Sequence, residues 1–203
     1  MDTAIIRAVN ELWLPVYPGI AGQIADHCAS PPGRMLEFGC FSGGIGLTLL
    51  QQFPQSTLTI APEIEELAAT FSSDWSNLLD RQAADRLSIV PGPLASMNVA
   101  DNSFDLVVCR GLFFFLDASG TLLSTLYRLT APGGFVFAGG GYGTYTPPET
   151  IERIAEESRR LNYSLGRKFF SREEFEQAIA GAGLAAHSRI IEEGGLWAVM
   201  KKA

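Results

Sequence analysis

From about residue 34 onward, short apolar runs alternate with segments of helical character, and this alternation limits the fold more than any other feature. Strands that alternate with helices are typical of βαβ units, which build a parallel sheet covered by helices on both faces. The predicted strands are residues 35–38, 57–60, 87–90, 104–109, 135–138, 184–191 and 196–200.

The last two predicted strands are separated only by residues 192–195. A parallel crossover needs about a dozen residues or more, so these strands must form an antiparallel hairpin. The sequence therefore predicts an α/β fold with three layers, whose seven-stranded sheet is mostly parallel and ends in an antiparallel C-terminal hairpin. This differs from a sheet built of purely parallel nucleotide-binding repeats.

Helix signals complete this organisation. Residues 43–52 and 121–129 read as helices, and Pro62 stands where another helix can begin. Thr146 and Ser171 each precede a glutamate by three residues, which predicts two capping boxes. Residues 2–14 and 18–28 read as two short helices, so we expect residues 1–33 to form an N-terminal helical cap on a unit of residues 34–203.

The net charge and the cysteines limit which binding partners and which cellular location we expect for this chain. The chain of 203 residues has a net charge of −7, a poor match for nucleic acid, which is bound through Lys and Arg. Cys28, Cys40 and Cys109 form no C-x-x-C pair, so we expect no metal, no disulfide and a cytoplasmic location. The most apolar stretch, residues 106–116, is broken by Arg110, so we expect no membrane insertion.

A glycine-rich turn between the first predicted strand and its helix is the strongest functional signal. Residues 35–46 read MLEFGCFSGGIG. Glycines permit positive φ and close approach of a ligand, and the following helix offers free N–H groups. A dinucleotide site needs G-x-G-x-x-G, but Phe41 stands where the second glycine should be, which disfavours a nicotinamide-dependent oxidoreductase. No G-x-x-x-x-G-K-[ST] phosphate loop is present.

This segment resembles the first motif of class I S-adenosylmethionine-dependent methyltransferases. Leu36 to Gly43 match its order of apolar residue, acid, apolar residue, Gly and Cys, and its closing Gly. The segments 90–94, 101–110 and 126–134 resemble the family's third-strand loop, fourth strand and Leu-x-Pro-Gly-Gly turn, and residues 170–184 resemble its last helix. The resemblance implies a Rossmann-like methyltransferase fold and S-adenosylmethionine-dependent methyl transfer to a small molecule.

The resemblance also implies where the cofactor would be held. In the family, the acid at the end of the first strand holds the methionine portion, and here that acid is Glu37. The implied cofactor contacts are Glu37, Gly39, Cys40, Phe41, Ser42, Gly43, Ala61, Pro62, Glu63, Gly92, Pro93, Leu94, Arg110 and Gly111.

The chain departs from the family pattern at three positions. Phe41 replaces the middle glycine of the loop, and Ala61 and Pro93 stand where two further acids would hold the ribose and the adenine. Glu63 is the nearest carboxylate to Ala61 in the sequence. A cofactor-binding protein of the same fold with lost or altered activity is therefore the alternative function.

Catalytic residues stay unknown, because a cofactor motif does not identify them. His27 and His187 stand away from the expected site, and Cys40 and Cys109 suit a buried core. Without an obvious base, a nucleophile that needs little help is favoured, such as a thiolate, an amine or an activated carbon. Candidate acceptor contacts are Tyr17, Phe114, Tyr142 and Tyr145, whereas the acceptor's identity and the oligomeric state stay open.

Overall fold

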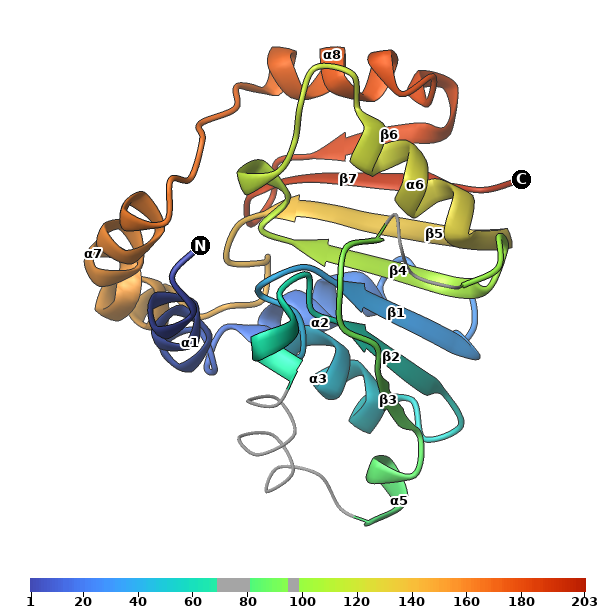
Figure 1. Cartoon of the computed structure of the whole chain (residues 1–203), viewed down its shortest axis with the longest axis horizontal. Coiled ribbons are helices and arrows are strands. Elements are labelled where there is room, and N and C mark those ends of the chain that lie inside the picture. The colour runs from blue at the N-terminus through green and yellow to red at the C-terminus, as the bar shows by residue number, and fades with distance from the viewer. Residues whose placement is uncertain (69–80, 95–98) are drawn as a thin grey trace.

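The computed structural model describes residues 1–68, 81–94 and 99–203, and its centre is one seven-stranded sheet (Figure 1). The strands lie in the order β3-β2-β1-β4-β5-β7-β6. Their bounds are β1 Arg34–Phe38, β2 Thr57–Ala61, β3 Leu87–Ile89, β4 Phe104–Arg110, β5 Thr130–Gly140, β6 Ser188–Ile191 and β7 Leu196–Lys201.

The sheet is parallel from β3 through β5, and β7 runs antiparallel to both β5 and β6. This confirms the predicted C-terminal hairpin. Because β1 and β4 are neighbours whose chains continue to opposite sides of the sheet, their carboxyl ends form the switch point at which open α/β sheets bind ligands.

Helices cover both faces of the sheet, and their apolar side chains form two core clusters. α6 and α8 pack on one face, α2 and α3 pack on the other, and α1 and α7 lie side by side beyond the carboxyl ends of the strands (Figure 1). The helices are α1 Thr3–Leu12, α2 Tyr17–Ala25, α3 Gly44–Gln52, α5 Arg81–Ala84, α6 Thr121–Leu129, α7 Pro148–Ser164 and α8 Arg172–Gly181, with 3-10 turns η3 Leu112–Phe114 and η4 Ala185–His187. None of the described helices has the length and apolar character needed to cross a bilayer.

Of the two predicted capping boxes, one is present in the structure and the other is not. The Ser171 side chain accepts from the Glu174 N–H, and the Glu174 carboxylate accepts from the Ser171 N–H, so this box is confirmed. The box at Thr146 was wrong: its hydroxyl instead donates to the Tyr142 carbonyl, and α7 begins at Pro148. The Thr146 hydroxyl is therefore bound to a carbonyl four residues earlier and does not cap α7.

Three other boundaries differ from the sequence expectation. The helix expected to begin at Pro62 begins at residue 65, and the structure describes it as far as residue 68. Residues 185–187 form η4 instead of extending β6, because the chain is still leaving α8 at Gly183, where φ is +73°. β5 begins at Thr130, directly after α6, so it is longer than the predicted strand.

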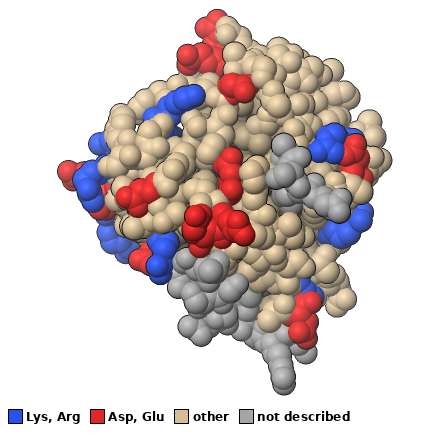
Figure 2. Space-filling model, in the orientation of Figure 1, with Lys and Arg blue, Asp and Glu red and all other residues tan. Residues whose placement is uncertain are grey.

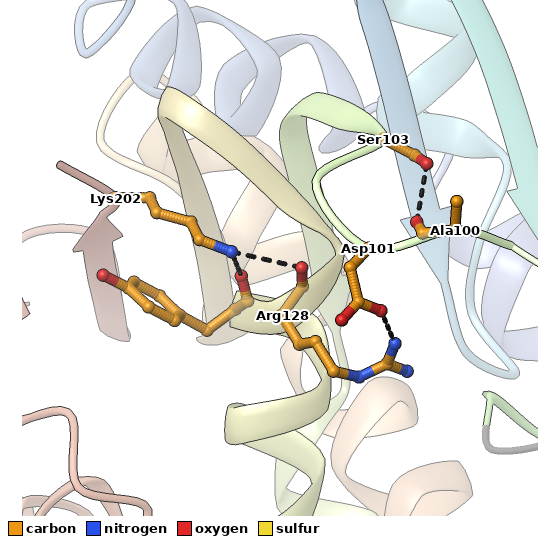
Figure 3. Close-up of polar contacts among 6 residues, drawn as sticks. Ala100, Asp101, Ser103, Arg128 and Lys202 are labelled. Carbon is orange, nitrogen blue, oxygen red and sulfur yellow. Dashed lines mark hydrogen bonds and ion pairs between the residues drawn. The ribbon is translucent and has the colours of Figure 1, made fainter.

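The carboxyl end of α6 is held by the chain's last residues (Figure 3). The Lys202 ammonium donates to the carbonyls of Tyr127 and Arg128, at 3.0 and 3.2 Å from Nζ, and Arg128 forms an exposed ion pair with Asp101. The two carbonyls also accept from the N–H groups of Thr130 and Asn102, and Lys202 adds a charged donor at the negative end of the helix dipole.

Candidate active site

The loops expected to contact a cofactor meet at the carboxyl edge of the sheet. The Gly39 N–H donates to the Ala61 carbonyl at 3.0 Å, and the Gly92 N–H donates to the Pro62 carbonyl at 2.9 Å. A Cβ on Gly39 would lie 3.7 Å from the Arg110 carbonyl oxygen. The loops after β1, β2, β3 and β4 therefore lie in contact at this edge.

Glu37 lies beneath this surface with its side chain fully buried. Its Oε2 accepts from the N–H groups of Gly43 and Gly46, both at 2.7 Å. Its Oε1 has no hydrogen-bond partner, although it is buried. Burial raises the pKa of the Glu37 carboxyl to about 7, and the N–H groups of Gly46 and Gly43, the charge of Arg110 and the N–H of Ile45 oppose this rise.

Two glycines give the loop its shape. Gly39 and Gly43 both have φ of +114°, a conformation that residues with a Cβ rarely adopt, and Gly43 is the N-cap of α3. Phe41 does not need that conformation, because Asn102 is the one non-glycine residue with positive φ in the described chain. The side chain at position 41 therefore causes no backbone strain.

The Phe41 ring is buried against the loop that follows β4. It packs on Phe114 with ring centroids 5.0 Å apart, and a Cβ on Gly111 would lie 2.5 Å from Phe41 Cδ2. Gly111 itself has φ of +78°. The aromatic ring thus occupies space that a side chain at position 111 would otherwise fill, and it forms one wall of the site.

Arg110, the last residue of β4, lies in an aromatic cage. Its guanidinium carbon is 4.0 Å from the ring centroid of Trp13, 5.4 Å from that of Tyr17 and 5.1 Å from that of Phe41. These distances suit cation–π attraction. The side chain is buried, and its Nη1 donates a long 3.4 Å hydrogen bond to the Tyr17 hydroxyl. Burial lowers the pKa of Arg110.

The N-terminal helices supply two sides of this cage. Trp13 donates from Nε1 to the Ser158 hydroxyl of α7 at 2.8 Å and stacks on Tyr142 at 4.9 Å between centroids. The Tyr17 ring packs on Gly44, where an added Cβ would lie 2.1 Å from the nearest ring atom. The Tyr17 hydroxyl lies 3.2 Å from Asn10 Oδ1. Burial raises the pKa of Tyr17 to about 12, so this phenol stays protonated at neutral pH.

The second acid at this edge is Glu63, which is half-buried and contacts the glycine loop. The Cys40 thiol donates to Glu63 Oε2 with an S–O distance of 3.8 Å. Burial raises the pKa of Cys40 to about 12 and raises that of Cys109 as well, so both thiols stay protonated. Neither is an activated nucleophile.

Two adjoining cavities lie between the loops after β4 and β5 and the helix α7. A narrow one of about 30 Å³ is lined by Trp13, Phe41, Arg110, Gly111, Phe113, Phe114, Gly140, Gly141, Asn162 and Arg167. A wider one of about 340 Å³ is lined by Phe113, Gly140, Gly141, Tyr142, Ile151, Arg167, Lys168, Phe169, Phe170, Gly194, Gly195 and Leu196. The wider cavity has the size of a small-molecule site.

The candidate acceptor residues are placed unequally. Phe114 lines the narrow cavity, Tyr142 lines the wider one, and Tyr17 lies beside Arg110. Tyr145 lines neither: it is 58% exposed and its hydroxyl donates at 2.5 Å to Asp26, the residue after α2. Among the positions after the third strand, Leu94 is buried in one of the two core clusters and Pro93 is exposed.

Sequence reasoning missed Asn162 and Arg167 as site residues. They lie at the end of α7 and in the connection to α8, which packing brings to the edge of the sheet. Arg167 belongs to the run Gly-Arg-Lys-Phe-Phe, whose mixture of basic and aromatic residues was the one available signal. His27 packs on Phe135 and Phe137, near the other end of β5, and the described residues hold no cluster of His, Cys, Asp and Glu suited to a metal.

Known proteins share this fold. A protein of Methanococcus maripaludis assigned to the S-adenosyl-L-methionine-dependent methyltransferases is 24% identical, with a TM-score of 0.81 over 100% of this chain and 94% of that chain. Human N-acetylserotonin methyltransferase, solved in complex with SAM, is 13% identical, with a TM-score of 0.68 over 99% of this chain and 55% of its own. At these identities the likeness concerns the fold alone.

The malonyl-[acyl-carrier protein] O-methyltransferase of Priestia megaterium is 27% identical over 78% of this chain and 56% of its own length, so the chain spans little more than half of that curated relative. Residues 36–138, just over half of the 203 residues, match the family described as the methyltransferase domain. The matched segment runs from β1 through most of β5 and includes Glu37, the glycine loop and Arg110. The chain therefore belongs to the methyltransferase domain family.

Proposed function

We propose that the protein transfers a methyl group from S-adenosylmethionine to a small-molecule acceptor. The observation that carries this proposal is the Glu37 carboxylate, which braces a glycine loop through Oε2 and keeps a buried Oε1 without a hydrogen-bond partner. Buried polar atoms normally have partners, so an unused acceptor beside a ligand-binding edge favours a bound ligand with donor groups.

The residues at this edge fit such a cofactor. Glu37 Oε1 and the buried Ser42 hydroxyl, which also has no hydrogen-bond partner, are suited to its polar groups. Gly39 and Gly43 let the backbone approach closely, and Glu63 offers a carboxylate where Ala61 and Pro93 do not. We keep the full set of implied cofactor contacts as part of this proposal: Glu37, Gly39, Cys40, Phe41, Ser42, Gly43, Ala61, Pro62, Glu63, Gly92, Pro93, Leu94, Arg110 and Gly111.

When bound, the cofactor supplies an electrophilic methyl group on a sulfonium. This chain's residues contribute position and exclusion of water: Trp13, Tyr17 and Phe41 wall the space around Arg110 with buried aromatic rings. The buried thiols stay protonated, and His27 lies at the far end of β5. We therefore propose an acceptor whose nucleophile is ready without a protein base.

The curated relative favours one acceptor class. The Priestia protein is named as an O-methyltransferase of a malonyl group on acyl carrier protein, and a carboxylate is already ionised at neutral pH. We propose a carboxylate-bearing acceptor here, in place of the thiolate, amine or carbon nucleophile that the sequence favoured. Loss of activity in the same fold stays the alternative, and no finding favours it. The helical cap of residues 1–33 on a unit of residues 34–203 and the cytoplasmic location are kept as proposals as well.

Isothermal titration calorimetry tests the cofactor. We expect S-adenosylhomocysteine to bind and NAD not to bind, whereas tight binding of NAD would contradict the proposal. Turnover of S-adenosylmethionine with a mixed pool of small carboxylic acids then separates an active transferase from a binding protein. No methylated product from any member of the pool, with S-adenosylhomocysteine still bound, would make the inactive alternative the leading one.

A further inference from the structure

The two cavities of the site share one wall and therefore form a single path. Phe113, Gly140, Gly141 and Arg167 line both of them. The wider cavity lies against the connection between α7 and α8, and Figure 2 shows a hollow with basic side chains beside it at the upper left, where Figure 1 places this connection. The narrow cavity continues inward to Arg110 and Phe41.

Two arginines lie along this path, and neither forms an ion pair within the described residues, although the Glu37 carboxyl acts on Arg110 at longer range. Arg110 is 5% exposed and Arg167 is partly buried, yet no ion pair joins either guanidinium to a carboxylate in the described residues. Arg and Lys are almost never buried in proteins unless they are paired. In a chain of net charge −7, a buried and a partly buried guanidinium on one path, neither of them ion-paired within the described residues, are unexpected.

The two guanidiniums also repel each other. Burial lowers the pKa of both side chains, and the charge of Arg167 lowers that of Arg110 further. Aromatic rings compensate in part, since Trp13 lies 4.0 Å from the Arg110 guanidinium and Phe169 lies 6.0 Å from that of Arg167. An anion between the two would remove the repulsion and supply acceptors for guanidinium N–H groups.

From this geometry we propose that Arg167, with Arg110 behind it, forms a subsite for an anionic group of the acceptor, and that this group is a carboxylate. The proposal rests on the proposed function and adds the residues that would bind the carboxylate of the acceptor. Lys168, exposed at the rim of the wider cavity, adds positive charge at the entrance. The apolar walls formed by Phe113, Phe170 and Leu196 suit the uncharged remainder of such a molecule.

Arg110 lies close enough to the glycine loop to contact the cofactor, so Arg167 is the residue that tests the subsite. The probes are the malonyl thioester of N-acetylcysteamine, its neutral methyl ester and inorganic phosphate, titrated by calorimetry with and without saturating S-adenosylhomocysteine. We expect the free acid to bind at least tenfold more tightly than the methyl ester, about 1.4 kcal/mol. Phosphate binding tighter than that of the acid would contradict the choice of a carboxylate.

The variants Arg167→Gln, Arg167→Lys and Arg153→Gln complete the test. Arg167→Gln should abolish the preference for the acid and leave the affinity for S-adenosylhomocysteine unchanged, and Arg167→Lys should retain part of the preference. Arg153→Gln removes the same charge from an exposed position on α7 outside both cavities and should change neither.

Three results would overturn the subsite. They are a preference that survives in Arg167→Gln, a parallel loss of S-adenosylhomocysteine affinity in that variant, and no binding of the acid to wild-type protein at millimolar concentration. Failure of the cofactor proposal would look different, because S-adenosylhomocysteine would then not bind at all. The Arg167-dependent preference could still be measured in its absence.

Discussion

The Glu37 carboxylate and the Gly46 backbone are in direct contact: Oε2 accepts from the Gly46 N–H at 2.7 Å, and a Cβ on Gly46 would lie 2.7 Å from the same oxygen. The carboxylate therefore joins the end of β1 to the second residue after the start of α3. This contact leaves no room for a side chain at position 46, and it fixes the glycine loop that lies between the two residues.

Replacing Glu37 by Gln should change how stability depends on pH. Because the folded-state pKa is raised to about 7 from an ordinary 4.5, ionisation of this carboxyl destabilises the fold progressively as pH rises from 4.5 to 7. Gln is neutral throughout and retains an oxygen for the two N–H donors. We expect the free energy of unfolding of Glu37→Gln relative to wild type to rise by about 2 kcal/mol between pH 5 and pH 8.

Urea unfolding at the two pH values measures this difference, with Glu152→Gln at an exposed position of α7 as the control. A constant difference across the range would mean that the carboxyl ionises normally in the folded protein. Glu37→Gln should also weaken the binding of S-adenosylhomocysteine by more than ~1 kcal/mol, which is the scale of a hydrogen bond to a charged group.

Gly46→Ala should destabilise the protein, although alanine ordinarily favours a helix over glycine by about 1 kcal/mol. The new Cβ would meet Glu37 Oε2 at 2.7 Å and both Leu58 methyl groups at 2.9 Å. We expect a loss of about 1–3 kcal/mol in thermal or urea unfolding. Gly22→Ala in α2 is the matched control, because the three atoms nearest to its Cβ would all belong to the exposed Tyr145 ring, at 3.1 Å or more. Equal stability changes in the two variants would refute the close contact.

Phe41→Gly should leave the affinity for S-adenosylmethionine equal or weaker, because the ring walls the site and its loss makes the loop more flexible. If the ring instead occupied the cofactor's space, the same change would strengthen binding. A tenfold gain in calorimetric affinity would decide for this second interpretation. Since loss of a buried ring can cost about 3–5 kcal/mol of stability, Phe41→Leu provides a second variant that keeps the core filled.

Lys202→Met should lower the free energy of unfolding by about 0.5–1 kcal/mol, because the carbonyls of Tyr127 and Arg128 lose their charged donor (Figure 3). Lys201→Met removes the same charge from an exposed position one residue earlier and should have little effect. The difference between the two variants should shrink in high salt, and a difference unaffected by salt would point to packing instead of charge.

The sequence predicted the sheet because buried parallel strands are nearly continuous apolar runs, such as Phe104–Arg110, and because residues 192–195 allow only a hairpin. The glycine loop was predictable for a similar reason, since Gly39 and Gly43 are required by a local backbone conformation. Thr146 was misread because a hydroxyl can satisfy either a helix N-terminus or a nearby carbonyl, and tertiary position decides between them.

The acceptor side of the site was harder to predict, because its residues come from segments far apart in the chain. Trp13 contacts Ser158 across 145 positions, and Arg167, in the connection after α7, lines a cavity together with the loop after β5. No local pattern encodes such a meeting. The partial signal was composition, an arginine among aromatic residues in a connection between two helices.

The residues that line the cofactor side and the acceptor side of the site come from different segments of the chain, which affects how the site can change among relatives. The glycine loop and Glu37 belong to the strand framework of residues 34–111, whereas Trp13, Asn162 and Arg167 are carried by the N-terminal helices, α7 and the connection to α8. A graft that exchanges those outer segments between relatives would bring a new set of acceptor contacts while leaving the cofactor loop intact. Selectivity for the molecule to be methylated can then change by recombination of whole segments, without passing through forms that have lost the donor.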